Sequence, residues 1–512
     1  MNANLFAIIR ERIVSQANIL LRTADGALVT YGDMLERSGR LANILVLRGV
    51  EPGDRVAAQV EKSPQALMLY LATLRAGAVY VPLNTAYTLR ELDYFLGDAT
   101  PRLMVCDPAR RLGLEEIART RAIEALETLD AAGQGSLSIA AAAAPAEFAD
   151  VPREGGDLAA ILYSSGTTGR SKGAMLTHWG LSSNALTLAE YWRFSEADVL
   201  LHALPIYHTH GLFAASSTAM VARASMIFLP KFDADAVLHL LPRASVFMGV
   251  PTFYTRLLGH AALTKQLCAH MRLFVSGSAP LLPETHQAFL LRTGHAILER
   301  YGMTETNMNT SNPYEGERRP GTVGLPLPDT QLRIADPQTG RLLNREEIGV
   351  IEVRGPQLFA GYWGLPEKTQ AEFRPDGFFV TGDLGKIDSR GYVHIVGRAK
   401  DLIISGGLNV YPKEIEVEID ALPGVVESAV VGVPHPDFGE AVTAVVVKEA
   451  AAALSEDSIL NALGERLAKF KLPKRVLFAD ELPRNTMGKV QKNLLRSAYL
   501  DLYASQATAM RG

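Results

Sequence analysis

The order of apolar residues between positions 31 and 106 restricts the possible folds of this chain more than any other feature. Apolar residues suit helices in residues 31–50, 63–75 and 90–97. Between these segments lie short apolar runs, typical of buried strands, at residues 55–60, 78–83 and 103–106. This strand–helix–strand repetition predicts an α/β fold with parallel sheets and helices on both faces.

The length of the chain and a change of pattern near residue 397 predict two domains. The chain has 512 residues, too many for one hydrophobic core. After residue 397, short strand patterns alternate with helical segments, at residues 413–420, 425–433, 442–447 and 455–469. We expect a large N-terminal domain of mixed sheets and helices, residues 1–398, and a small α+β C-terminal domain, residues 399–512.

Composition and charge narrow the classes of protein. The net charge is −4, so nothing in the overall charge indicates a nucleic-acid partner or an anionic membrane surface. Two separate cysteines, Cys106 and Cys268, form no disulfide framework and no zinc motif. The most apolar stretch, residues 212–229, is interrupted by Arg223, and the first residues lack the apolar core of a signal peptide. We expect a cytoplasmic enzyme without membrane or nucleic-acid contacts.

A glycine- and hydroxyl-rich segment follows an apolar run at residues 158–163. It contains, in order, Ser164, Ser165, Gly166, Thr167, Thr168, Gly169, Arg170, Ser171, Lys172 and Gly173. Glycines let the backbone approach an anion, successive N–H groups and hydroxyls can bind it, and Lys172 can place a positive charge on a polyphosphate. The spacing differs from that of the P-loop NTPases. The alternative interpretation of this segment alone is an ordinary surface turn.

The segment Tyr163-Ser164-Ser165-Gly166-Thr167-Thr168-Gly169-Arg170-Ser171-Lys172-Gly173 resembles the phosphate-loop signature of the adenylate-forming superfamily. That superfamily includes acyl-CoA synthetases, adenylation domains of peptide synthetases and beetle luciferases. Four more segments match in the same order: Tyr301-Gly302-Met303-Thr304-Glu305-Thr306, Thr381-Gly382-Asp383, Gly397-Arg398-Ala399-Lys400-Asp401 and Pro483-Arg484-Asn485-Thr486-Met487-Gly488-Lys489. The resemblance implies the adenylate-forming fold, with a mobile C-terminal domain. It also implies that ATP activates a carboxylic acid as an acyl-adenylate and that coenzyme A then takes the acyl group.

The resemblance implies a nucleotide site built from these motifs. The phosphate loop would hold the β- and γ-phosphates, Thr304 would donate to the α-phosphate, and Asp383 would accept both ribose hydroxyls. Further nucleotide contacts are implied for Ser278, Ala279, Pro280, Tyr301, Gly302, Met303 and Arg398. Mg²⁺, which prefers one or two carboxylates together with phosphate oxygens, would bind Glu305 and Thr168. Taken alone, Glu305 could be a helix N-terminal residue and Asp383 a turn residue.

The C-terminal motifs imply residues for catalysis and domain movement. Lys489 would bridge the substrate carboxylate and the α-phosphate and neutralise the charge that develops there. Lys400 takes the hinge position, about which the C-terminal domain would turn between the two half-reactions. Gly406 and Gly407 would allow the thiol arm of coenzyme A to approach closely. Acylation of Lys489 would remove its charge, so a lysine acyltransferase and a deacylase are hypothetical partners.

The identity of the acid depends on polar residues where a fatty-acid pocket would be apolar. His208, at a position that gates this superfamily's acid site, is a candidate catalytic and substrate residue, together with His210 and Ser278. The segments around Tyr207, Val250, Ser276 and Tyr301 resemble those of the malonyl-CoA synthetases. A malonate site needs a cation for the second carboxylate, and the planar fork of an arginine suits it best. We choose Arg256, with Arg292 and Arg300 as weaker candidates.

Several alternatives remain open at this stage. Methylmalonate differs by one methyl group and is expected to be a slower substrate. The chain could instead activate another short-chain, aryl or fatty acid, or load a carrier protein. A luciferase-like oxygenase is less expected, because the chain lacks a peroxisomal ending. An inactive relative that senses adenylates would be expected to lack Lys489, Glu305 or Asp383, and all three are present.

Overall fold

The computed structural model describes residues 2–164, 171–406, 408–485 and 488–503. The chain divides into two compact units. Unit 1 comprises Met1–Pro320, Gly324–Gln331 and Val353–Phe379, and unit 2 comprises Gly321–Val323, Leu332–Glu352 and Val380–Gly512. The domain boundary expected between residues 398 and 399, next to the proposed hinge at Lys400, remains a prediction.

A six-stranded sheet holds the first predicted strands of unit 1. Its order is β6-β5-β3-β4-β7-β8, and every neighbouring pair is parallel except β7 with β8. The strands are β3 (Arg55–Gln59), β4 (Val79–Pro82), β5 (Leu103–Cys106), β6 (Ala125–Thr128), β7 (Leu158–Ser164) and β8 (Lys172–Thr177). The predicted parallel sheet is confirmed, and β7 leads directly to the predicted phosphate loop.

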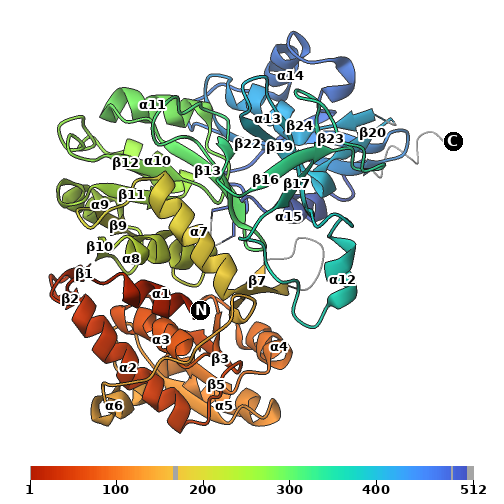
Figure 1. Ribbon diagram of the computed structural model, residues 1–512. Coiled ribbons are helices and arrows are strands. Elements are labelled where there is room, and N and C mark those ends of the chain that lie inside the picture. Colours follow the sequence, from red (N-terminus) through yellow and green to blue (C-terminus); the bar gives the residue numbers. More distant parts are fainter. Residues whose placement is uncertain (1, 165–170, 407, 486–487, 504–512) are drawn as a thin grey trace. The chain divides into compact units, whose positions relative to one another are not determined.

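Helices cover this sheet (Figure 1), and three of them begin at residues whose side chains cap them. Thr30 and Thr88 each form a capping box with an acidic residue three positions later, and Ser63 caps the helix that starts at Pro64. The helices of this part are α1 (Leu5–Glu11), α2 (Tyr31–Leu47), α3 (Pro64–Arg75), α4 (Leu89–Ala99), α5 (Arg111–Thr120) and α6 (Ser136–Ala143).

A nine-stranded sheet forms the rest of the core of unit 1. Its order is β15-β14-β13-β12-β11-β9-β10-β1-β2, with the strands from β13 to β1 parallel and the ends antiparallel. The strands are β1 (Ile19–Thr23), β2 (Leu28–Thr30), β9 (Val199–His202), β10 (Ser225–Phe228), β11 (Val246–Gly249), β12 (Leu273–Ser276), β13 (Leu298–Met303), β14 (Asn307–Ser311) and β15 (Leu325–Pro326).

The remaining helices of unit 1 connect or cover these strands (Figure 1). They are α7 (His178–Tyr191), α8 (Thr218–Val221), α9 (Ala234–Leu240), α10 (Pro251–Leu258), α11 (Pro283–Thr293) and α12 (Pro366–Ala371). A π-helix, His210–Ser217, follows β9 and is fully buried. Phe247, Phe274, Tyr254, Leu257 and Phe289 form one apolar cluster, which fixes α10 and α11 against β11 and β12.

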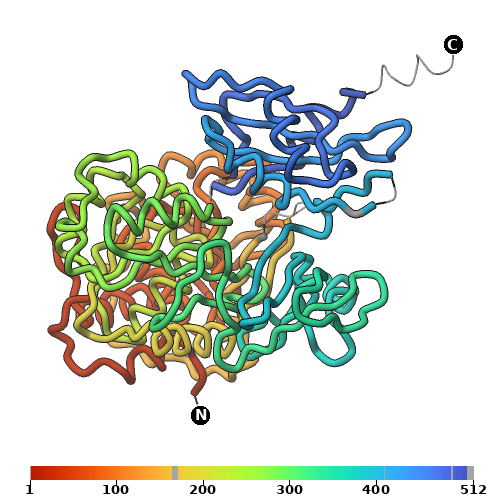
Figure 2. The backbone as a smooth tube through the Cα atoms, turned by 90° about the horizontal axis from the view of Figure 1, so that it is seen from above, coloured from red at the N-terminus to blue at the C-terminus, as the bar shows by residue number. Residues whose placement is uncertain are grey.

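Unit 2 contains a four-stranded and a five-stranded sheet (Figure 2 traces its later residues in blue). The four-stranded sheet, which is mainly in unit 2, has the order β16 (Gln331–Ala335), β17 (Gly349–Arg354), β18 (Phe379–Ile387) and β19 (Val393–Arg398). The five-stranded sheet contains β20 (Ile403–Ser405), β21 (Leu408–Val410), β22 (Val425–His435), β23 (Gly439–Lys448) and β24 (Arg475–Phe478). Its helices are α13 (Pro412–Asp420), α14 (Glu456–Gly464) and α15 (Lys492–Ala498). The predicted α+β C-terminal part is confirmed, although α14 ends five residues earlier than residue 469.

None of the helices in the described part of the chain is long and apolar enough to cross a bilayer.

Candidate active site

The acid side of the candidate site lies where neighbouring parallel strands of unit 1 end. β11, β12 and β13 are adjacent and parallel, so their carboxyl ends lie at one edge of the sheet. Ser276 ends β12, and Arg300 lies on β13, beside the residues that follow β12. Ligands in open α/β sheets bind at this edge, outside the carboxyl ends of the strands.

Arg300 is a buried cation, and two of its nitrogen atoms lack a hydrogen-bond partner in the described part of the chain. The residue is only 3% exposed, and these two atoms are the Nε and Nη2 of its side chain. A Cβ on Gly277 would lie 2.4 Å from Cζ of Arg300, so glycine is required there for the guanidinium to fit. Glu299 is adjacent on the strand, but successive residues of a strand point to opposite faces. Burial lowers the pKa of Arg300 to about 9. An anionic ligand would offset this loss of hydration.

Two histidines surround this arginine. Burial, and then the charge of Arg300, lowers the pKa of His208 to about 4. Burial also holds the pKa of His210 well below its ordinary value, with Arg300 as the second cause. His210 Nδ1 lies 3.2 Å from Ser278 Oγ, and its Nε2 has no partner among the described residues. Both imidazoles are therefore neutral near pH 7 and can donate or accept hydrogen bonds, while Arg300 supplies the charge.

Other polar groups near this edge also lack partners. Thr209, 2% exposed, and Ser276, 1% exposed, have hydroxyl oxygens without a hydrogen-bond partner among the described residues. Ser278 has φ 73°, a left-handed conformation that is rare for a residue other than glycine. Strained backbone and unpaired buried polar atoms together are typical of a ligand site.

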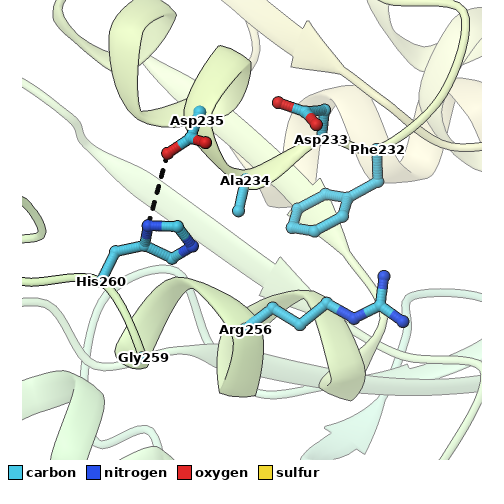
Figure 3. Close-up of a pocket in the computed structure, with 7 residues that line it drawn as sticks. All are labelled: Phe232, Asp233, Ala234, Asp235, Arg256, Gly259 and His260. Atoms are coloured by element: carbon cyan, nitrogen blue, oxygen red, sulfur yellow. Dashed lines mark ion pairs between the residues drawn. The ribbon is translucent and has the colours of Figure 1, made fainter.

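The structure does not place Arg256 with these histidines. Arg256 is exposed on α10, whose Tyr254 and Leu257 face the core. Figure 3 shows its side chain in a surface pocket beside Phe232, Asp233 and Asp235, where Asp235 pairs with His260. Arg292 donates to the backbone carbonyls of Leu258, His260 and Leu263, so its guanidinium has a structural role. Of the three arginines proposed from the sequence, only Arg300 is buried beside the histidines.

The phosphate side of the candidate site contains four connected side chains of unit 1. The hydroxyl oxygen of Tyr362 lies 3.1 Å from Glu305 Oε1 and 2.7 Å from Glu372 Oε2, and its single proton is shared between the two carboxylates. Lys172 Nζ lies 3.6 Å from Glu372 Oε1 and 4.4 Å from the centre of the Tyr362 ring. The predicted phosphate cation and the predicted metal ligand therefore belong to one cluster. The predicted loop residues Ser165, Gly166, Thr167, Thr168 and Gly169 lie outside the described residues, and Ser164 ends β7.

The predicted contacts at Tyr301, Gly302, Met303 and Thr304 lie at the end of β13 and in the turn that follows it. Glu305 lies in this turn, before β14, and is 6% exposed. The alternative that Glu305 starts a helix is therefore wrong. Ser278, Ala279 and Pro280 follow β12 directly, so these two motifs follow neighbouring strands.

Unit 2 brings three predicted residues together. Asp383 lies on β18 opposite Arg398 on β19, and Arg398 Nε is 2.7 Å from Asp383 Oδ1. Asp383 is buried within the strand, so the alternative of a turn residue is wrong. Burial, and then the charge of Arg398, lowers the pKa of Lys489, whereas Asp383 and Asp401 oppose that shift. Gly488 has a left-handed backbone, φ 73°, and the N–H of the next residue, Lys489, donates to Asn485 Oδ1 at 2.9 Å.

The predicted hinge and coenzyme A residues also lie in unit 2. Lys400 lies in a 3₁₀ turn, Ala399–Asp401, directly after β19. Gly406 has φ 58° and donates its N–H to the carbonyl of Phe438. Gly407 lies outside the described residues. The roles of these residues remain predictions.

Sequence reasoning missed Tyr362 and Glu372 and underrated Arg300. Tyr362 is in an aromatic-rich segment, where nothing distinguishes a residue that contacts Glu305. Glu372 is one of several acidic residues around α12. Arg300 follows Glu299 directly, which gives the appearance of an ordinary charged pair. The apolar pattern around Arg300 predicts a buried strand, and a charge on such a strand needs a partner, so this pattern could have indicated a ligand-binding role for Arg300.

Comparison with known proteins identifies the family. Residues 11–363 match the AMP-binding enzyme family, and residues 414–489 match the AMP-binding enzyme C-terminal domain. The chain belongs to the family of AMP-binding enzymes, which confirms the predicted adenylate-forming fold.

Individual relatives cover almost the whole chain. A crystal structure of ATP-bound MatB from Rhodopseudomonas palustris is 63% identical with a TM-score of 0.97, covering 98% of this chain and 100% of that chain. A feruloyl-CoA synthase of an Amycolatopsis species is 36% identical, over 93% of this chain and 94% of its own length. A malonate–CoA ligase of Arabidopsis thaliana is 33% identical, over 93% of this chain and 85% of its own length.

Proposed function

We propose that this chain is an ATP-dependent malonate–CoA ligase. The reaction converts malonate, ATP and coenzyme A to malonyl-CoA, AMP and pyrophosphate through a malonyl-adenylate. Methylmalonate is a slower substrate, because one methyl group changes binding by only about 1–3 kcal/mol. The similarity to AMP-binding enzymes, including a malonate–CoA ligase, supports this reaction class.

Arg300 is the observation that carries the choice of acid. Curated relatives of similar identity act on ferulate and on malonate, so identity at that level does not choose between acids. An acid with one carboxylate would leave Nε and Nη2 of Arg300 buried without a hydrogen-bond partner among the described residues. Malonate has a second carboxylate, which would match the planar fork of Arg300. His208, His210 and Ser278 would add hydrogen bonds to the same acid.

The phosphate side fits ATP with Mg²⁺. Mg²⁺ binds through one or two carboxylates plus phosphate oxygens, and it would supply positive charge to the phosphates. Glu305, a buried carboxylate oriented by Tyr362, fits this donor set. The described residues contain no cluster of three or more metal-binding side chains of the kind that would cage another metal. Lys172 would bind the β- and γ-phosphates, together with the loop that includes Thr168.

Unit 2 would supply the ribose contact and the adenylation lysine. Asp383 would accept the ribose hydroxyls, and its ion pair with Arg398 holds the carboxylate in place. Lys489 would lie between the attacking carboxylate and the α-phosphate, where it neutralises charge in the transition state. Lys400 would be the hinge for the second half-reaction, in which Gly406 and Gly407 would contact the thiol arm of coenzyme A.

Release of AMP from the purified protein tests this function. The assay contains ATP, Mg²⁺, coenzyme A and one acid from the set malonate, methylmalonate, succinate, acetate, butyrate and benzoate. We expect the highest kcat/KM with malonate, a lower value with methylmalonate, and no turnover when EDTA removes Mg²⁺. A higher kcat/KM with a monocarboxylate would contradict the choice of malonate while keeping the reaction class.

Lys489 is also a candidate site of regulation by acylation. An acyl group on its amine would remove the charge that adenylation needs. Mass spectrometry of the protein from cells with and without a deacylase tests this idea, with an acylated Lys489 peptide expected to accumulate without the deacylase. Consistently unmodified Lys489 would disprove it. The two buried free cysteines, Cys106 and Cys268, are compatible with the reducing cytoplasm that we propose as its location.

A further inference from the structure

A carboxylate outside the predicted motifs connects the two ends of the phosphate site. Glu372 caps the C-terminus of α12, where a negative charge is unfavourable because the helix dipole is negative at that end. The pKa of Glu372 is nevertheless lowered. Burial alone would raise this pKa, but the hydrogen bonds from Lys368 and Tyr362 and the charge of Lys172 together lower it by more. Nearby donors and cations therefore stabilise the charged form of Glu372.

Backbone pairing fixes Tyr362 beside Lys172. Residues 360–363 run alongside β8: Ala360 N donates to Met175 O, Met175 N to Gly361 O, and Trp363 N to Gly173 O, at 2.8–2.9 Å. Tyr362 is 3% exposed, and its amide donates to the side chain of Thr369. Lys172, the first residue of β8, therefore lies beside a buried phenol whose backbone pairs with the same strand.

The contacts of Glu372 differ in strength. Lys368 Nζ and Tyr362 Oη both lie 2.7 Å from the carboxylate, whereas Lys172 Nζ lies 3.6 Å away. Lys172 can therefore turn to another anion while Glu372 keeps two short contacts. That handover leaves no uncompensated charge, which is the usual cost of breaking an ion pair that is partly buried.

We propose that Glu372 is a positioning residue for ATP: it is the resting counter-ion of Lys172, and Lys172 leaves it when the phosphates bind. Tyr362 links the same carboxylate to Glu305, so the exchange also reaches the candidate metal ligand. The inference rests on the proposed function, because it takes Lys172 as a ligand of the ATP phosphates.

Calorimetric titration of ATP in EDTA, without acid or coenzyme A, tests the exchange. Glu372→Gln removes the competing charge and keeps the shape of the side chain, so we expect ATP to bind about threefold more tightly, the size of a partly exposed ion pair. In a Lys172→Met background the same substitution should change ATP binding much less, since no lysine remains to be released. Glu367→Gln is the matched control, because it removes an exposed charge from the same helix.

The double-mutant comparison separates the outcomes. An equal gain from Glu372→Gln with and without Lys172, or from Glu367→Gln, would show a general field effect and overturn the proposal. Weaker or unchanged binding in Glu372→Gln would also overturn it. Thermal unfolding of each variant identifies those that fail to fold; if Glu372→Gln does, Lys368→Met provides the second test. It leaves Glu372 more dependent on Lys172 and should weaken ATP binding, and no weakening would count against the proposal. Failure of the wild type to bind ATP both in EDTA and with Mg²⁺ present would instead contradict the proposed function.

Discussion

Lys62 and Arg300 are both basic and almost fully buried in unit 1, 6% and 3% exposed, but their surroundings differ. Lys62 Nζ lies 2.8 Å from both His202 Nδ1 and the His202 carbonyl oxygen, and 4.2 Å from the centre of the Phe228 ring. His202 in turn contacts Gly211 O and Ser216 Oγ on the buried π-helix. Arg300 has no such partners for Nε and Nη2 among the described residues.

This difference indicates that Lys62 stabilises the fold, whereas Arg300 is placed to bind a ligand. The nitrogen of Lys62 completes a hydrogen-bond chain, and burial lowers its pKa well below the ordinary value. A buried basic group without partners lowers the stability of the folded state, so its presence indicates a function. Substitution of both residues by the same apolar side chain should therefore have opposite consequences.

The largest expected effect is the loss of malonate recognition in Arg300→Met. We expect kcat/KM for malonate to fall about 100- to 1,000-fold, because the variant buries the second carboxylate without its charged partner. The free energy of unfolding should stay the same or rise, since an unpaired charge is replaced by an apolar side chain of similar length. AMP-release kinetics and urea unfolding at pH 7 measure the two quantities.

Lys62→Met is the matched control for that experiment. It should keep the preference for malonate over acetate, because Lys62 is not among the residues around the acid. A loss of malonate preference in both variants, with similar destabilisation, would mean that Arg300 is also structural and that the comparison fails.

A pH titration sharpens the comparison through His208. Its pKa is about 4 in the folded chain, below the ordinary 6.5, so between these values the unfolded chain binds the extra proton. The stabilising contribution of His208 is therefore complete above pH 6.5 and decreases, by up to about 3 kcal/mol, as the pH falls to 4. Part of the shift comes from Arg300, so Arg300→Met should raise the pKa of His208 and reduce this pH dependence.

His178 is an internal control for the titration. Its pKa is also about 4, because of burial and then of Arg153, with no contribution from Arg300. NMR titration of the imidazole signals should show a higher pKa for His208 in Arg300→Met than in the wild type, and an unchanged pKa for His178. An unchanged pKa of His208 would mean that the charge of Arg300 does not affect this histidine.

A smaller effect is expected for the stability of Lys62→Met. The variant leaves His202 Nδ1 buried without its donor, while the His202 carbonyl oxygen still accepts from the N–H of Leu229, and the free energy of unfolding should fall by about 1–3 kcal/mol. Urea unfolding gives this value directly. A variant as stable as the wild type would show that water or a shift of His202 replaces the lysine nitrogen.

Much of the fold followed from sequence pattern, because local spacing determines it. The predicted strands at residues 55–60 and 103–106 correspond to β3 and β5 almost residue for residue. The predicted helix at residues 455–469 ends at Gly464, since glycine stabilises helices poorly. Asp383 was expected at a strand end, but β18 continues four residues beyond it. The length of β18 depends on its antiparallel pairing with β19, which the residues around Asp383 do not reveal.

The residues of the candidate site that belong to short motifs could be predicted from the sequence. The residue that binds the acid could not, because its choice depends on which arginine is buried. Lys172, Glu305, Asp383 and Lys489 follow from motif resemblance. The choice among arginines depends on tertiary packing: Arg300 lies on a buried strand between β12 and β14, whereas Arg256 is on a helix. The apolar spacing of Tyr254 and Leu257 on α10 already indicates that Arg256 faces outward, and only the sheet order shows how deeply Arg300 is buried.

The smallest expected effect is that of Arg256→Met, which tests the arginine favoured by the sequence. Its side chain is exposed in a surface pocket with Asp233 and Asp235, so loss of the charge should change the free energy of unfolding by less than about 0.5 kcal/mol. Malonate should remain the preferred acid, because the guanidinium is not among the buried groups around His208 and His210. The same AMP-release and urea measurements as for Arg300→Met apply. If malonate preference collapsed here and persisted in Arg300→Met, the anchor would be Arg256, and α10 would have to rotate to present it to the acid.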